Sequence, residues 1–444
     1  MMSIRVGMVS LGCPKNQMDA ELMLAKLEHA GLEIVADAAL ADVVIVNTCG
    51  FIEDAKKESI EQILEFAKLK DEGRIKRIVV TGCMAERYRE ELVDELPECD
   101  AVLGLGANGD IVEAVKAAAD GEKTVRFPAK SCWSLDGDRV LTTPSFFAYL
   151  RVGDGCNNRC AYCAIPLIRG GLRSRAFDTL VNEAQALAAM GVKELVLIAQ
   201  DTTLYGTDLY GESKLADLLE MLCKIEGIHW IRLLYCYPEH ITDDLLAVMA
   251  KEDKIAKYID MPIQHCAGHV LKAMNRPGNR ETLTETVKRI RAAVPGIVLR
   301  TTVMTGFPGE TEEDFNELCE FVQEMKFERL GCFAFSPEEG TKAATLPDQI
   351  EDDVKAHRRD IIMQEEERVM QAYGEAQIGT VKEVLVESFD RYAECWFGRT
   401  AADAPDIDGK VFFSCEDGAV APGDIVRVEI VDAMDMDLMG VCVE

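Results

Sequence analysis

GDGCNNRCAYC, residues 153–163, places Cys156, Cys160 and Cys163 in a C-x-x-x-C-x-x-C spacing, which is the most informative feature of the chain. Three thiolates can hold three irons of a [4Fe–4S] cubane, whereas an electron-transfer cluster normally has four cysteine ligands. One iron is then left open for another ligand. A zinc site or three buried structural thiols is the alternative. Zinc requires a fourth Cys or His at ligand spacing, and none follows within about twenty residues.

The spacing also carries an aromatic residue, Tyr162, immediately before its last cysteine. In these features it resembles the motif of the radical S-adenosylmethionine superfamily. The resemblance implies that the open iron chelates the amino and carboxylate groups of S-adenosylmethionine. One electron then cleaves the sulfonium into methionine and a deoxyadenosyl radical. Cys156, Cys160 and Cys163 are thus the expected catalytic cluster ligands, and Tyr162 is expected beside the cofactor.

Length and charge limit the number of domains, the cellular compartment and the class of partner that we expect. A chain of 444 residues suggests about three domains. No signal segment opens the sequence and no apolar run reaches the length of a membrane span, so we expect a cytoplasmic protein with no membrane partner, whose thiols serve iron rather than disulfides. The formal net charge of -30 repels phosphate backbones and attracts basic partners. An acidic surface that merely maintains solubility is the alternative.

The first 120 or so residues alternate short apolar strands with helical patterns. Such alternation is typical of a parallel α/β sheet with right-handed crossovers. The predicted elements are strands at 4–10, 42–47 and 78–81, and helices at 17–30, 53–68 and 85–96. We therefore expect residues 1–120 to form an N-terminal parallel α/β sandwich.

One cysteine follows each of these three strands: Cys13, Cys49 and Cys83. Ligands bind at the carboxyl ends of strands in an open α/β sheet, so thiols about 35 residues apart in sequence can converge there. A buried cysteine is also common as a small core residue, which is the alternative for each taken singly. Three in successive units predict a second three-cysteine cluster site.

Residues 121–145 break the pattern with glycines and prolines and are predicted to be a linker. From 146 to 374 the alternation returns. Strands are predicted at 146–152, 194–199, 230–234, 258–261, 298–304 and 330–335, with a long helix at 351–373. Six units are too few for a closed eight-unit barrel. A partial, TIM-like β/α barrel, open on one side for a large substrate, is expected.

The active edge of such a barrel is formed by the carboxyl ends of its strands. Gln200 and Asp201 follow the second predicted strand, and the turn from Gly306 to Glu310 follows the fifth. Glycine lets backbone amides approach a ligand closely. Gln200, Asp201, Gly306 and Glu310 are therefore candidates for the adenosine and methionine pocket.

A basic run directly follows the cysteine motif and contains Arg169, Arg173 and Arg175. Guanidinium groups pair bidentately with carboxylates. The run is therefore a candidate to bind the carboxylate of methionine or of a substrate, and a plain surface loop is the alternative.

Beyond residue 375 the pattern changes to short strands separated by turns, predicted at 380–386, 409–413 and 425–431, as in a small β-barrel. Barrels of this kind often bind RNA. Residues 375–444 carry 16 acidic and 5 basic side chains, a net of -11, which is the wrong sign for phosphate contacts.

In this order the features resemble the methylthiotransferase family, whose members have an N-terminal cluster domain, a radical S-adenosylmethionine partial barrel and a C-terminal, OB-like TRAM domain. Its RimO branch modifies an aspartate of the twelfth protein of the small ribosomal subunit. That branch is resembled by SLGCPKN at 10–16, NTCGFI at 47–52 and RTAADAPDIDG at 399–409. The branch that modifies tRNA adenosine usually shows GCQMN and NTCSVR instead. Asp154 stands where the family often has Glu, a change that touches no cluster ligand.

The resemblance implies two [4Fe–4S] clusters, S-adenosylmethionine as cofactor, and transfer of a methylthio group to the aspartate β-carbon. Cys13, Cys49 and Cys83 would hold the cluster that delivers the methylated sulfur, and a second S-adenosylmethionine would supply its methyl group. The expected partners are a basic ribosomal protein as substrate and an electron donor such as flavodoxin or ferredoxin, with tRNA unlikely. Methylthiolation of tRNA and a non-catalytic iron–sulfur electron carrier are the rival functions.

Overall fold

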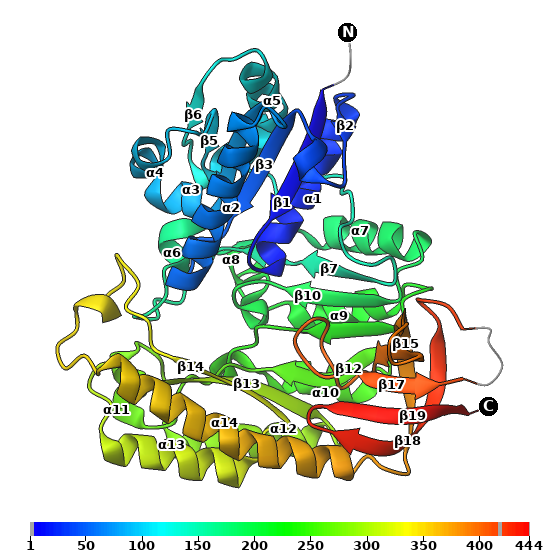
Figure 1. Cartoon of the computed structure of the whole chain (residues 1–444). Coiled ribbons are helices and arrows are strands. Elements are labelled where there is room, and N and C mark those ends of the chain that lie inside the picture. Colours follow the sequence, from blue (N-terminus) through cyan, green and yellow to red (C-terminus); the bar gives the residue numbers. More distant parts are fainter. Residues whose placement is uncertain (1–3, 416–419, 444) are drawn as a thin grey trace. The chain divides into compact units, whose positions relative to one another are not determined.

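The computed structural model describes residues 4–415 and 420–443, which form two compact units (Figure 1). One unit contains the described residues up to 142 together with 153–175 and 336–344. The other contains 143–152, 176–335 and the described residues from 345 onward. The segment that carries Cys156, Cys160 and Cys163 therefore belongs to the same unit as the N-terminal sheet.

The first unit is built on a parallel sheet with strand order β2-β1-β3-β4-β5-β6. Its strands are β1 (Arg5–Ser10), β2 (Glu33–Ile34), β3 (Val43–Thr48), β4 (Arg77–Gly82), β5 (Ala101–Leu103) and β6 (Thr124–Arg126). Its helices are α1 (Pro14–His29), α2 (Glu53–Asp71), α3 (Cys83–Tyr88), α4 (Glu90–Glu95), α5 (Ile111–Ala119) and α6 (Ile165–Ile168). A separate antiparallel pair is formed by β8 (Gly153–Asp154) and β9 (Arg173–Ser174).

Alternate residues of the buried strands face opposite layers, as the period of two requires. Val43 and Ile45 pack with α1 and α5 in one core, whereas Val44 and Val46 pack with α2, α3 and α4 in the other. The sheet is thus covered by helices on both faces, which confirms the predicted parallel α/β sandwich.

Two local predictions differ from the structure. The helix expected at 85–96 begins at Cys83 and is interrupted at Arg89, whose φ of 43° is left-handed. The Arg89 side chain pairs with Glu86 at 2.6 Å across the break. The segment 121–145, predicted to be a linker, supplies strand β6, which pairs with β5.

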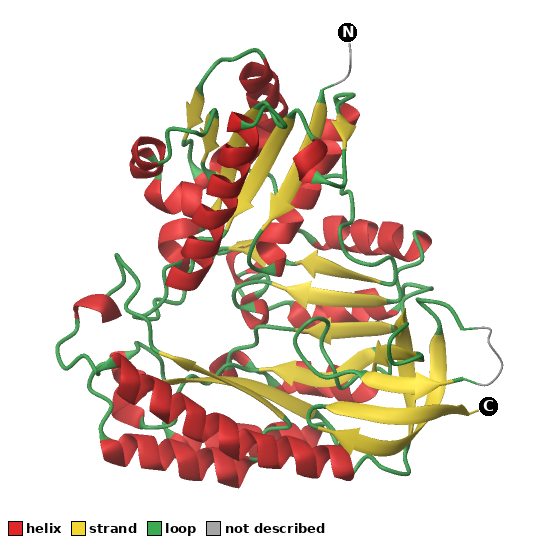
Figure 2. Cartoon of the chain, in the orientation of Figure 1, coloured by secondary structure: helices red, strands yellow, loops and turns green. Residues whose placement is uncertain are grey.

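The second unit contains an open sheet of six parallel strands in the order β14-β13-β12-β11-β10-β7. They are β7 (Phe147–Arg151), β10 (Glu194–Ile198), β11 (Trp230–Leu233), β12 (Ile255–Asp260), β13 (Val298–Thr305) and β14 (Arg329–Ala334). The helices are α7 (Phe177–Ala189), α8 (Thr207–Tyr210), α9 (Leu215–Cys223), α10 (Asp243–Lys251), α11 (Gly268–Ala273), α12 (Arg280–Ala293), α13 (Glu312–Met325) and α14 (Asp352–Glu375). The partial barrel and its six strands are confirmed (Figure 2).

The same unit ends in a closed barrel with strand order β15-β16-β17-β19-β18. Its strands are β15 (Val381–Asp390), β16 (Cys395–Arg399), β17 (Val411–Ser414), β18 (Ile425–Met434) and β19 (Asp437–Val443). The expected small C-terminal β-barrel is therefore confirmed. Among the described residues no helix is both long and apolar enough to cross a membrane.

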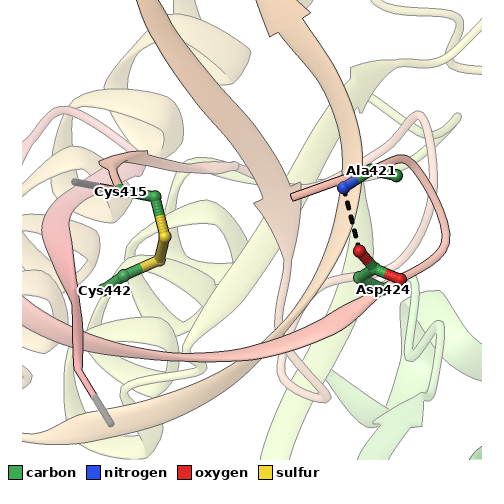
Figure 3. The surroundings of a disulfide bond; sticks show 4 residues. All are labelled: Cys415, Ala421, Asp424 and Cys442. Carbon is green, nitrogen blue, oxygen red and sulfur yellow. Dashed lines mark hydrogen bonds between the residues drawn. A yellow bond between two sulfur atoms is a disulfide. The ribbon is translucent and has the colours of Figure 1, made fainter. Parts of the chain in front are cut away.

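A disulfide joins Cys415, just after β17, to Cys442 in β19 (Figure 3). Its two Cα atoms are 5.0 Å apart, although 27 residues separate the cysteines in sequence. The parallel pairing of β17 with β19 brings them together. The expectation that the thiols serve iron rather than disulfides is wrong for this pair.

Buried ion pairs attach the segment 399–409 to the sheet of the partial barrel. Glu194 in β10 lies 2.6 Å from the Arg232 guanidinium and 2.8 Å from that of Arg399. Asp403 pairs with Arg329 at 2.8 Å, and these groups are almost completely buried. Removing one member of such a set leaves an uncompensated buried charge. The RTAADAPDIDG motif therefore has a structural role in joining the two parts of this unit.

Glu366 in α14 is fully buried facing β14, and burial raises its pKa to about 8, although Arg329 nearby acts to lower it. The pKa is thus above the value of about 4.3 expected in the unfolded chain. The stability this carboxyl contributes is fully present below pH ~4.3 and is lost as the pH rises toward 8. We expect Glu366→Gln to remove this loss. From pH 6 to pH 8 the free energy of unfolding of the parent should fall by about 2 kcal/mol relative to the variant.

Equilibrium denaturant unfolding at the two pH values measures this difference. The adjacent Glu367 is exposed, so Glu367→Gln is the matched control and should follow the parent at both pH values. The same pH dependence in Glu366→Gln and in the parent would contradict the assignment.

Candidate functional site

Cys13, Cys49 and Cys83 follow three neighbouring strands, β1, β3 and β4. Cys13 is the N-cap of α1, Cys49 comes directly after β3, and Cys83 opens α3. The strands are in register, because Asn47 of β3 pairs with both Ser10 of β1 and Thr81 of β4. All three thiols therefore lie at one edge of the sheet, the carboxyl edge that the sequence predicted.

A buried amide connects the loops that carry these cysteines. Asn16 Nδ2 lies within hydrogen-bond distance of three carbonyl oxygens, those of Leu11 (2.8 Å), Asn47 (3.2 Å) and Thr48 (3.2 Å). On the other side, the Ser59 hydroxyl donates to the Cys49 carbonyl at 3.0 Å and accepts from the Cys49 amide at 3.1 Å. Local hydrogen bonds thus hold the Cys49 backbone in place.

The chemistry of this donor set fits an iron–sulfur cluster. Burial raises the pKa of Cys83 to about 12 and also raises that of Cys49, and Cys13 acts in the same direction on both. Iron binding must therefore displace protons from these thiols. A Cβ on Gly12 would lie 2.7 Å from the Cys49 sulfur, so glycine is needed at that position.

Among the described residues no group of three or more potential ligands is placed to hold a single metal ion. In a cubane each thiolate binds a different iron, so its cysteines lie farther apart than the ligands of one ion. The placement of Cys13, Cys49 and Cys83 at one sheet edge fits a cluster of this kind.

The second set, Cys156, Cys160 and Cys163, lies between β8 and α6 of the same unit. Cys156 and Cys160 are buried and Cys163 is half-buried, and burial raises the pKa of Cys163 to about 12, with Cys160 and Cys156 acting in the same direction. The Cys156 amide donates to the Gly170 carbonyl at 3.0 Å. Tyr162, which lies between Cys160 and Cys163 in sequence, is half-buried.

The backbone geometry at the start of this loop requires glycine at position 155. Its φ is +76°, and a Cβ there would lie 2.2 Å from the Gly171 carbonyl oxygen. Any side chain at this position would push the two ends of the cysteine loop apart. The Gly-x-Gly-Cys pattern thus brings the loop close to the strand that follows it.

The arginine run is neither a plain surface loop nor free to bind a ligand. Arg169 is 2 % and Arg175 is 3 % exposed. Arg169 pairs with Asp19 at 2.9 Å and Asp154 at 3.1 Å, and Arg175 pairs with Asp136. These guanidinium groups bind carboxylates, as their chemistry predicts, but the carboxylates are the chain's own.

Of the residues predicted for the cofactor pocket, Asp201 follows β10 at the carboxyl edge of the second unit's sheet, next to the half-buried Gln200. Asp201 is buried and accepts hydrogen bonds from the Thr203 amide at 3.1 Å and from His240 Nδ1 at 3.0 Å. Burial acts to lower the pKa of His240, but Asp201 outweighs it and raises that pKa. A histidine 39 residues away gives no sequence signal of this pairing.

Gly306 and Glu310 also lie at the carboxyl edge, after β13, and they contact each other. The Gly306 amide donates to Glu310 Oε2 at 2.8 Å, and Glu310 Oε1 pairs with Arg358 of α14 at 2.7 Å. A Cβ on Gly306 would lie 2.2 Å from the Lys355 side chain. The turn is thus packed against α14, and its role in binding S-adenosylmethionine stays a prediction, as do those of Gln200 and Asp201.

Comparison with known families gives three successive matches. Residues 5–104 match the uncharacterized protein family UPF0004, residues 150–322 match the Radical SAM superfamily, and residues 378–443 match the TRAM domain. A solved radical S-adenosylmethionine methyltransferase, TsrM from Kitasatospora setae, shares the fold with a TM-score of 0.56 at 15% identity. The alignment covers 74% of this chain and 73% of that one.

Full-length relatives carry the comparison further. The ribosomal protein uS12 methylthiotransferase RimO of Clostridioides difficile is 47% identical over 98% of both chains. That of Pelotomaculum thermopropionicum is 48% identical over 99% of both chains. In Anaeromyxobacter sp. (strain K) the identity is 49%, covering 99% of this chain and 93% of the relative. The chain therefore belongs to the RimO family of radical S-adenosylmethionine methylthiotransferases.

Proposed function

We propose that this enzyme adds a methylthio group to the β-carbon of an aspartate in ribosomal protein uS12. The names of its relatives give uS12 as their substrate. The observation that carries the proposal is that two three-cysteine sets lie in one compact unit. A simple electron carrier has no need of an open iron, whereas a cubane held by only three cysteines would leave one iron open at each set.

The β-carbon of aspartate is not acidic enough for an ionic base to remove its hydrogen at a useful rate, so a radical route is needed. When bound, a [4Fe–4S] cluster with three thiolate ligands would supply the electron that the cleavage of S-adenosylmethionine requires. Cys156, Cys160 and Cys163 would hold that cluster, and Tyr162 lies within the same loop. Cys13, Cys49 and Cys83 would hold the cluster from which the methylated sulfur leaves.

Charge supports a protein substrate over tRNA. The chain carries a formal net charge of -30, which repels the phosphates of a nucleic acid. Ribosomal proteins contact RNA and are rich in Lys and Arg, so an acidic enzyme attracts them. We place the reaction in the cytoplasm, where ribosomes are assembled, with a one-electron donor such as flavodoxin or ferredoxin.

The test is an anaerobic reaction of the reconstituted enzyme with S-adenosylmethionine and reductant, offered uS12 and bulk tRNA in parallel. Mass spectrometry should show a mass increase of about 46 Da on one uS12 aspartate, as replacement of H by SCH₃ requires. Unmodified uS12 together with methylthioadenosine in tRNA would replace the proposed substrate. Absence of deoxyadenosine as well as of product would favour the electron carrier.

A further inference from the structure

One arginine contacts both parts of the first unit that carry cysteines. Arg169 follows α6 in the segment of Cys156, Cys160 and Cys163, yet its Nη2 lies 3.4 Å from the Cys83 sulfur of the other set. We propose that Arg169 is a positioning residue that holds the Cys83 thiolate and raises the reduction potential of the cluster on Cys13, Cys49 and Cys83. This inference deepens the proposed function and rests on it for the identity of that cluster.

The guanidinium is fixed from several sides. Besides Cys83, Nη2 lies 2.9 Å from Asp19 Oδ2 and 3.4 Å from Asn16 Oδ1, and Nη1 lies 3.1 Å from Asp154 Oδ1. Arg169 is 2 % exposed, and both carboxylates are almost completely buried. A planar guanidinium with five donors can engage all these groups at once, which an ammonium cannot.

The contact to sulfur is the chemically important one. Hydrogen bonds to cluster sulfurs and nearby charge are two of the means by which proteins set the potential of iron–sulfur clusters. Reduction adds a negative charge to the cluster, so a buried cation at Cys83 favours the reduced form. Outer-shell partners of metal ligands typically change affinity or activity by about 10- to 100-fold when they are mutated.

Arg169 and the residue after it make different kinds of contact with the two cysteine sets. Gly170, the next residue, accepts the hydrogen bond of the Cys156 amide at 3.0 Å. The side chain of Arg169 thus contacts Cys83 while its neighbour holds Cys156. A change at Arg169 is therefore expected to alter sulfur transfer more than cleavage of S-adenosylmethionine.

A test isolates the cluster in question. In the full chain with Cys156, Cys160 and Cys163 all changed to Ala, the reconstituted protein holds only the cluster on the other three cysteines. Its midpoint potential is measured by redox titration with EPR detection. Arg169→Gln should shift the potential to a more negative value, and Arg169→Lys should shift it less because the charge is kept.

The matched control is Arg139→Gln. The side chain of Arg139 is also only 5 % exposed, and it pairs with Glu21, which lies two residues beyond Asp19 on α1, at 2.6 Å. Because its guanidinium engages Glu21 rather than a cysteine, the control should keep the parental potential. Parental potentials in both Arg169 variants, at full iron content, would overturn the proposal.

The Lys variant also guards against a failure of Arg169→Gln to fold. In the otherwise native enzyme, Arg169→Lys should form deoxyadenosine at close to the parental rate while methylthio transfer falls about tenfold. A parallel loss of both would indicate a merely structural role and overturn the proposal. The potential is measured without substrate, so a shift in it stands even where uS12 proves not to be the substrate.

Discussion

The Cys156→Ala variant is expected to lose S-adenosylmethionine cleavage, with deoxyadenosine falling to the background of the reaction without enzyme. Two thiolates remain at that site, and a site-differentiated cubane requires three. No other thiol lies close in sequence, since the nearest cysteines outside the set are Cys132 and Cys223. The measurement is chromatographic quantification of deoxyadenosine from the anaerobically reconstituted variant with dithionite.

The control is Cys132→Ala. Cys132 is exposed in the same unit and belongs to neither cysteine set, so its removal tests for a general effect of losing a thiol. It should form deoxyadenosine at the parental rate. Parental deoxyadenosine formation in Cys156→Ala, by contrast, would show that the cluster ligands lie elsewhere.

Cys49→Ala is expected to separate the two halves of the reaction. Cleavage of S-adenosylmethionine should persist, because Cys156, Cys160 and Cys163 are intact, while methylthio transfer to uS12 should fall to background. Iron content should drop from about eight to about four atoms per chain, since each cubane holds four. Deoxyadenosine and modified uS12 are measured from the same reaction.

Two outcomes decide this second prediction. Retention of both the iron and the transfer activity in Cys49→Ala would remove Cys49 from the ligand set. Loss of cleavage together with transfer would show instead that the two sites depend on each other structurally. Circular dichroism of the variant distinguishes that case from unfolding.

Much of this architecture could be predicted because its strands are buried on both faces. Val43 to Val46 and the strand after Arg77 are continuous apolar runs, which is typical of parallel strands under two layers of helices. Each of the two cysteines Cys49 and Cys83 comes at the end of such a run. Local patterns thus sufficed to place the thiols at one sheet edge.

What could not be predicted depends on contacts between residues far apart in the chain. Arg169 and Asp19 are 150 residues apart, so no local pattern in the sequence indicates that they pair. The Cys415–Cys442 disulfide likewise depends on the pairing of β17 with β19. Strand β6 has three residues, only one of which is half-buried. It is too short and too exposed to show the alternation of apolar and polar residues by which a strand is predicted.

The interruption of the helix at Arg89 has a different cause. A positive φ in a non-glycine residue is strained and is kept only where its surroundings hold it. Here the Glu86 carboxylate pairs with Arg89 and also accepts a hydrogen bond from the Leu105 amide at 3.0 Å. Nothing in the local pattern of 85–96 signals that tertiary contact.

The measurement that tests the central claim most directly follows the hydrogen that is removed. uS12 carrying aspartate deuterated at the β-carbon is offered to the reconstituted enzyme, and the deoxyadenosine formed is analysed by mass spectrometry. The account predicts deoxyadenosine one mass unit heavier, in step with the appearance of methylthiolated uS12. Modified uS12 accompanied by deoxyadenosine without deuterium would contradict abstraction from the β-carbon by the radical formed on this enzyme.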